Sequence, residues 1–173
     1  MASPSPSHTS SFGGAPLRIK SALALRGPVL RVRPFSPQDL PPVSAIVRDA
    51  LRENYPTSLY LDIHRWWRDG FLVAEEGSSV VGFLAAVVSA PQLARVLMLA
   101  VYGTWRRRGI GSALMDAFLK ECAMRGIHGV ELEVRKSNDS AIRFYTRYGF
   151  EITNLLPKFY TDGEDGYKMR RHF

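Results

Sequence analysis

The stretch that decides the fold is residues 102–112, which read Tyr-Gly-Thr-Trp-Arg-Arg-Arg-Gly-Ile-Gly-Ser. It joins a β-rich run, residues 93–102, directly to a run of apolar residues at helical spacing. Glycines let a backbone approach an anion closely, and a helix N-terminus offers unpaired N–H donors and a partial positive charge. Together with the charges of Arg106, Arg107 and Arg108, this strand-turn-helix predicts a site for a diphosphate.

A plain glycine turn with solvated arginines is the alternative interpretation of this stretch. Two other phosphate-binding motifs do not fit it. The turn lacks the Gly-Lys-Ser/Thr ending of a nucleotide P-loop, and it lies in mid-chain, unlike the glycine turn that opens a dinucleotide-binding fold.

The pattern of apolar residues outside the turn predicts the remaining elements, because alternation indicates strands and a period of three to four indicates helices. Before the turn we expect a strand at 29–33, a helix starting at 36–39, a helix at 58–69 with Trp66 and Trp67 on its apolar face, and strands at 71–75, 80–89 and 93–102. After it we expect a helix at 109–125, a strand at 130–134, a helix from Asn138 to Gly149, and strands at 150–155 and 166–171. The order βααβββαβαββ predicts an α/β fold with a mixed, mostly antiparallel sheet of about seven strands flanked by four helices.

Composition divides the chain into a tail and a domain. Residues 1–28 are rich in Ser, Pro and Gly, which predicts a disordered tail before a domain at 29–173; an organelle transit peptide is the alternative. Residues 1–38 hold five of the 23 Lys and Arg residues and no acid, which leaves 18 basic and 16 acidic residues beyond them. Most of the formal charge of +7 therefore lies in the N-terminal residues 1–38, and the near balance of charges beyond them argues against nucleic-acid binding by the domain.

Cysteine, histidine and hydropathy narrow the class of protein further. The single cysteine, Cys122, cannot form an internal disulfide, which favours a reducing, cytoplasmic location, and its apolar helical surroundings predict a buried thiol. The four histidines form no cluster at ligand spacing, so we expect no metal. No apolar run approaches the roughly 20 residues that cross a bilayer, so we expect no membrane partner.

Three further segments place the turn in a family context. Residues 97–101 read Leu-Met-Leu-Ala-Val, residues 132–138 read Leu-Glu-Val-Arg-Lys-Ser-Asn, and residues 141–150 follow Ala-Ile-x-x-Tyr-x-x-x-Gly-Phe. With the turn, these segments resemble the GNAT superfamily of N-acetyltransferases over about residues 29–169. The resemblance is closest to the branch of ribosomal-protein alanine acetyltransferases and archaeal and eukaryotic N-terminal acetyltransferases. It implies the GNAT fold and acetyl-CoA as cosubstrate.

The resemblance also implies how the cofactor is held. The backbone of Leu99, Ala100 and Val101 would pair with the pantetheine arm like an added strand. The other residues expected to bind the cofactor are Arg106, Arg107, Arg108, Gly109, Ile110, Gly111 and Ser112 at the pyrophosphate, and Asn138 at the arm. Asn138 also reads as a plain helix N-cap, and the two roles are compatible.

Glu133 and Tyr145 are the expected catalytic residues. In the alternating strand, Glu133 faces away from Leu132 and Val134, so it could enter the cleft as a general base, directly or through water. A solvated residue or an ion-pair partner is the alternative. Tyr145 lies two helical turns after Asn138, and the resemblance implies that its hydroxyl protonates the leaving thiolate. A core tyrosine is the alternative.

The acceptor side of the reaction is predicted from two loops. By resemblance, Tyr55 and Tyr160 would bind the first residues of a peptide; lids over the core are the alternative. The expected function is transfer of acetyl from acetyl-CoA to the α-amino group of protein N-termini by direct attack in a ternary complex. Alternatives are lysine side chains or small amines such as polyamines as acceptors, or a non-catalytic acyl-CoA-binding module. Ribosome association, oligomeric state and the preferred first residue stay open.

Overall fold

The computed structural model describes residues 29–173, so the predicted tail, residues 1–28, lies outside the described residues. Seven strands form one sheet in the order β1-β2-β3-β4-β5-β7-β6. The strands are β1 (Leu30–Pro34), β2 (Phe71–Glu76), β3 (Ser79–Ala90), β4 (Leu93–Val101), β5 (Gly129–Arg135), β6 (Glu151–Leu156) and β7 (Gly166–His172). The helices are α1 (Leu40–Ile46), α2 (Thr57–Trp66), α3 (Ile110–Met124) and α4 (Asp139–Arg147). The predicted element order and fold class are confirmed, with β4 and β5 forming the parallel pair of the mixed sheet.

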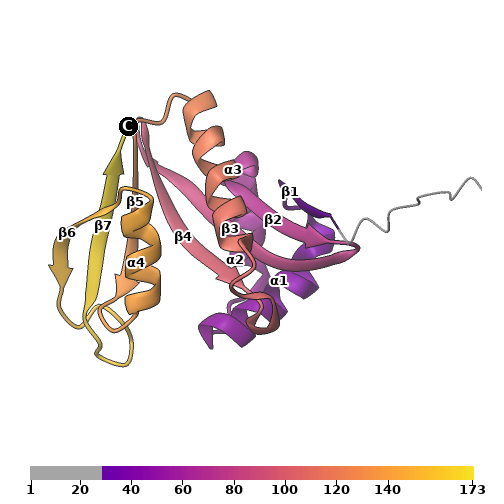
Figure 1. The fold of residues 1–173 in the computed structure, drawn as a ribbon, viewed down its shortest axis with the longest axis horizontal. Coiled ribbons are helices and arrows are strands. Elements are labelled where there is room, and N and C mark those ends of the chain that lie inside the picture. The colour runs from indigo at the N-terminus through magenta and orange to yellow at the C-terminus, as the bar shows by residue number, and fades with distance from the viewer. Residues whose placement is uncertain (1–28) are drawn as a thin grey trace, which may run out of the picture.

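Helices cover both faces of the sheet. Phe83 and Ala85 of β3 belong to the core cluster packed by α1 and α2, whereas Leu84 and Ala86 belong to the cluster packed by α3 and α4. Because successive strand residues point to opposite faces, the two pairs of helices lie on opposite faces. Figure 1 shows α3 and α4 in front of the sheet.

The first helical segment begins as predicted and ends in an unusual turn. The Asp39 carboxylate accepts a hydrogen bond from the Ser36 backbone N–H at 2.8 Å, the reciprocal bond of a capping box. After α1 the chain makes one π-helical turn, Val47–Leu51, and Arg52 then takes a left-handed conformation with φ 58°. Such turns are rare and are concentrated at functional sites. This one leads into the loop that carries Tyr55.

The prediction for the tryptophans is half wrong. Trp67 is buried at 3% exposure, but Trp66 is 63% exposed. Helix α2 ends at Trp66, earlier than predicted, and Trp67 is extended, with φ −154° and ψ 92°. This break in helical geometry turns the Trp67 ring toward Phe118 of α3, with 5.7 Å between ring centroids. Helical spacing therefore no longer describes where the two rings point.

Candidate active site

The sheet opens between its two middle strands. β4 and β5 pair only from Leu93 with Gly129 to Val96 with Leu132. The β3–β4 register then shifts across Leu97, which is a bulge, and β4 continues alongside β3 while β5 continues alongside β7. Figure 1 shows the two strands diverging below the end marked C. The backbone of β4 beyond the bulge therefore has a strand neighbour on one side only, as a slot for an extended ligand requires.

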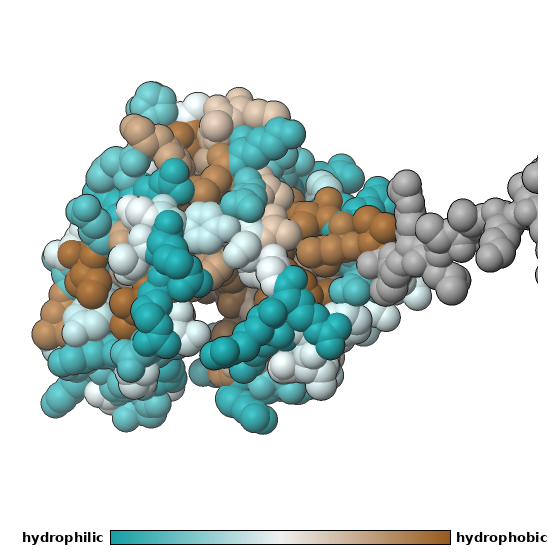
Figure 2. Space-filling view, in the orientation of Figure 1, coloured by the Kyte–Doolittle hydropathy of each residue, from teal (hydrophilic) through white to brown (hydrophobic). Residues whose placement is uncertain are grey.

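A cavity of about 870 Å³ lies at this opening. In Figure 2 a gap separates the part of the surface over α4 from the part over α1 and α2. The cavity is lined by ten of the residues predicted to bind the cofactor: Leu99, Ala100, Val101, Arg106, Arg107, Gly109, Ile110, Gly111, Ser112 and Asn138. Arg108 does not line it, because its guanidinium lies over the Trp105 ring, 4.6 Å from the centroid. Trp105 itself lines the cavity.

The turn before α3 has the backbone shape of an anion site. Arg107 and Gly109 both take positive φ values, 61° and 77°. For arginine this conformation is uncommon, and alternation of this kind directs successive N–H groups toward one concave point. Gly109 is also the N-cap of the 15-residue helix α3, whose first N–H groups need acceptors from outside the helix. The donor set therefore fits a diphosphate.

Asn138 fulfils the role of helix cap that the sequence predicted. Its side-chain oxygen accepts a hydrogen bond from the Ala141 backbone N–H at 3.1 Å. Because the carboxamide oxygen is engaged by the helix, the amide NH₂ remains the donor that a ligand in the cavity would meet.

Tyr145 lines the same cavity and is held by aromatic neighbours. Its ring meets Phe144 and Phe150 nearly edge-on, with centroid distances of 5.3 and 5.6 Å. Burial, with a smaller contribution from Tyr160, raises the pKa of the Tyr145 hydroxyl above its ordinary value. The hydroxyl therefore carries its proton at neutral pH, as a proton donor must.

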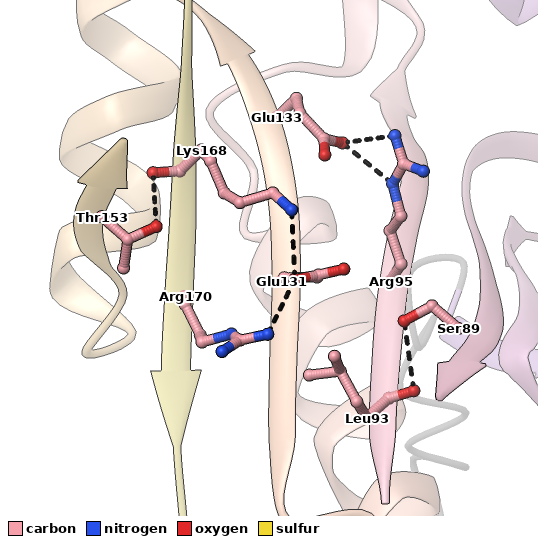
Figure 3. A network of polar contacts seen from close by, with 8 residues as sticks. All are labelled: Ser89, Leu93, Arg95, Glu131, Glu133, Thr153, Lys168 and Arg170. Carbon is pink, nitrogen blue, oxygen red and sulfur yellow. Dashed lines mark hydrogen bonds and ion pairs between the residues drawn. The ribbon is translucent and has the colours of Figure 1, made fainter. Parts of the chain in front are cut away.

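Glu133 is paired with Arg95, a residue that no local sequence pattern indicates. The Nε and Nη2 atoms of Arg95 each lie 3.0 Å from one carboxylate oxygen, Oε2 of Glu133. Figure 3 shows this pair bridging β4 and β5, with the second oxygen of Glu133 turned away from Arg95. Glu133 is therefore an ion-pair partner, which was the alternative interpretation. It also lies on the face of β5 opposite to the core residues Leu132 and Val134, as predicted. Neighbouring Glu131 is engaged separately, by Lys168 and Arg170 of β7.

Tyr160 is fixed by a latch between its loop and the end of β5. Arg135 places its guanidinium over the Tyr160 ring, 4.1 Å from the centroid, and donates hydrogen bonds to Asp162 and Glu164 at 2.8 Å. Glu164 also accepts from the Ser137 backbone N–H at 3.0 Å. Burial raises the pKa of Tyr160, while Arg135 opposes that rise.

The structure brings the predicted catalytic and acceptor residues into one region. The pKa of Tyr160 is affected electrostatically by both Glu133 and Tyr55, and Tyr160 in turn affects the pKa of Tyr145. Such mutual effects need short separations, because interactions between charges decay within about 10 Å in salt solution. Burial, followed by Glu53, raises the pKa of Tyr55. The four side chains therefore lie in one region, in which Glu133 follows the last β4–β5 pair and Tyr145 is the one of the four that lines the cavity.

Three further predictions concern the cysteine, a metal site and a membrane span. Cys122 is buried, and burial raises the pKa of its thiol to about 12, so the predicted structural thiol is confirmed and a thiolate nucleophile is excluded at neutral pH. Within residues 29–173 no group of three or more His, Cys, Asp or Glu side chains is placed to hold a metal. No helix of the described part is long and apolar enough to cross a membrane.

Comparisons with known proteins agree with this geometry. The model of the acetyltransferase (GNAT) family matches residues 40–150. An N-alpha-acetyltransferase of Sulfurisphaera tokodaii is 35% identical over 165 residues, which are 87% of this chain and 98% of the relative. The crystal structure of Ard1 from Thermoplasma volcanium is 45% identical, with a TM-score of 0.80, and the match covers 83% of this chain and 97% of that one. The catalytic subunit of the Arabidopsis thaliana N-terminal acetyltransferase A complex is 32% identical over 149 residues, 82% of this chain and 77% of the subunit.

Proposed function

Because the chain belongs to the acetyltransferase (GNAT) family, we propose that it transfers the acetyl group of acetyl-CoA to the α-amino group of protein N-termini. Membership makes the chain an acetyl-CoA-dependent acyltransferase. The names of its relatives, N-alpha-acetyltransferase among them, support the α-amine as acceptor. The proposal is supported by the proximity of Glu133, Tyr145, Tyr55 and Tyr160, which is indicated by their mutual effects on the pKa values of Tyr145 and Tyr160.

The residues of the cavity fit the cosubstrate. Acetyl-CoA supplies an activated acetyl thioester. The one-sided backbone of Leu99, Ala100 and Val101 suits the amide groups of an extended arm, and the turn at Arg107 and Gly109 suits the diphosphate.

Direct attack by the amine is the mechanism that the side chains support. An α-amine has a pKa near ~8, so a carboxylate needs to remove a proton only from the charged fraction. Glu133 can do so with the oxygen that Arg95 leaves free, directly or through water. Tyr145, whose hydroxyl is protonated, donates to the leaving sulfur. Cys122 is buried and protonated, so a cysteine-linked acyl intermediate finds no support.

Tyr55 and Tyr160 form the acceptor side of the proposal. Each belongs to a loop on a different half of the opened sheet, and Arg135 holds Tyr160 in place. Two tyrosines that face each other across a peptide offer ring faces for its side chains and hydroxyls for its backbone. The first residues of the acceptor peptide would bind between these two tyrosines.

Release of thiol from acetyl-CoA tests this function with a panel of short peptides that differ only in residue one. The proposal expects turnover that depends on the first residue. Turnover with polyamines but with no peptide would contradict it. Binding of acetyl-CoA without turnover on any acceptor would favour a non-catalytic module.

We further propose that the reaction takes place in the cytoplasm. The support is Cys122, the single cysteine of the chain, which is a free thiol as a reducing compartment requires. Association with ribosomes stays a prediction, and cosedimentation of the tagged chain with ribosomes at physiological salt checks it.

A further inference from the structure

Two arginines of α4 belong to the cavity but have no role in the chemistry described so far. Arg143 and Arg147 both line it. They are four residues apart, so they lie on the same face of the helix, one turn from each other. Both are exposed, and neither forms an ion pair with an acidic side chain within residues 29–173. Their charges are available to a ligand.

Helix α4 is held firmly beside the anion-binding turn. The Tyr148 hydroxyl lies 3.1 Å from the Ser112 carbonyl oxygen and 2.9 Å from Oδ1 of Asp116, both in α3. At the other contact, a Cβ added to Gly111 would lie 3.8 Å from the Phe144 ring. The arginine-bearing face therefore lies next to the first turn of α3.

The number of positive charges exceeds what a diphosphate needs. The cavity is lined by Arg106, Arg107, Arg143 and Arg147, and none of its lining residues is acidic. A diphosphate that links two alcohols carries two negative charges, which the first two arginines and the backbone N–H groups of the turn can match. A phosphate monoester adds a charge of about −1.5 to −2 near neutral pH. The second pair of arginines has the charge and the spacing for such a group.

We propose that Arg143 and Arg147 bind the 3′-phosphate of the CoA ribose and so make the enzyme select CoA over its dephospho form. CoA carries this monoester beside its diphosphate, at the end opposite the thiol. The inference rests on the proposed use of acetyl-CoA, but it assigns a separate subsite. Asp116 is the acid next to this end of α4, and its Oδ1 atom is occupied by Tyr148.

Isothermal titration with CoA and with dephospho-CoA tests the proposal on the wild-type chain, on Arg143→Ala, on Arg147→Ala and on the double variant. Wild type should bind CoA about tenfold more tightly than dephospho-CoA, the value of one or two charge-assisted hydrogen bonds. Each single variant should weaken CoA binding by about threefold to tenfold and leave dephospho-CoA binding unchanged. The double variant should bind the two ligands equally.

Arg65→Ala is the matched control, because Arg65 is an exposed arginine on α2 that does not line the cavity. This variant should change the affinity for neither CoA nor dephospho-CoA. It therefore distinguishes the loss of a local contact from the loss of one positive charge. Equal weakening of both ligands in the α4 variants would overturn the proposal by assigning these arginines to the diphosphate. Unchanged affinities would overturn it as well. A wild-type chain that binds both ligands but acetylates no acceptor would contradict the proposed function alone, and one that binds neither would contradict both.

Discussion

The Asp49 carboxylate accepts a hydrogen bond from the backbone N–H of Gly103, with 2.8 Å between Oδ2 and the nitrogen. Asp49 lies in the π-helical turn that leads to Tyr55, and Gly103 opens the segment that leads to the anion-binding turn. A Cβ at Gly103 would lie 3.2 Å from the same oxygen, so glycine permits this approach. One bond thus joins the turn that leads to Tyr55 and the segment that leads to Arg107, across 54 residues of sequence.

Replacement of Asp49 tests this link. Asp49→Ala should raise the KM for both acetyl-CoA and peptide about fivefold, because a lost hydrogen bond is worth about 1 kcal/mol. Asp49→Asn should keep values near wild type, since its carboxamide oxygen can still accept the bond. Steady-state kinetics with each substrate varied in turn make the comparison. Equal losses in both variants would assign the effect to charge instead.

Replacement of Glu133 should affect turnover more than binding. Glu133→Gln should lower kcat about 100-fold, since general-base catalysis contributes at least that much. Arg95→Ala should lower kcat about tenfold because the carboxylate loses its fixed orientation. Glu131→Gln is the control: it lies on the same face of β5 but bonds to Lys168 and Arg170. If Glu131→Gln slowed turnover as much as Glu133→Gln, Glu133 would not be the base.

Removal of the Tyr145 hydroxyl should leave the protein folded but lower its kcat. Tyr145→Phe keeps the ring packed on Phe144 and Phe150, and it should lower kcat about 100-fold with little change in Tm. Tyr167→Phe is the control, because Tyr167 of β7 pairs with Val134 and does not line the cavity, and it should retain wild-type kcat. Since burial raises the pKa of Tyr145, its protonated form persists above the ordinary range of tyrosine. The kcat of wild type should therefore show no loss attributable to tyrosine ionisation up to about pH 10. An alkaline fall that Tyr145→Phe abolishes would contradict this.

The latch around Tyr160 should respond to acid. Hydrogen bonds from the Ser137 hydroxyl, Arg135 and the Ser137 backbone N–H lower the pKa of Glu164 to about 2. The unfolded-state value is near ~4.3, so the stabilisation is complete above that pH and is lost as the pH falls through about 2. The unfolding free energy of Glu164→Gln should therefore depend less on pH between about 5 and 2 than that of wild type. Urea titrations at several pH values measure the slope; identical slopes would show that Glu164 is not linked to folding.

Local patterns in the sequence predict most of the fold, and ten of the residues that they single out line the cavity. Alternation in 130–134 and helical spacing after Gly109 are properties of short segments, so their elements follow from them. The strand-turn-helix that holds Arg107 is local as well. The positive φ of Arg107 could not be predicted from the sequence, since arginine rarely adopts this conformation.

Contacts between segments that are far apart in the sequence could not be predicted from local patterns. Arg95 and Glu133 are 38 residues apart and meet because of the register between β4 and β5. Trp66 is exposed because α2 ends where helical spacing would continue. The spacing of Arg143 and Arg147 is visible in the chain, but only the packing of α4 on α3 places it beside the turn.

Tandem mass spectrometry of one acetylated peptide shows most directly whether the acceptor is an α-amine. The peptide carries a free N-terminus and an internal lysine, and a second version has its α-amine blocked; each is incubated with the purified chain and acetyl-CoA. We expect acetyl on the α-amine of the first peptide and none on the second. Acetyl on the lysine of both peptides would contradict it.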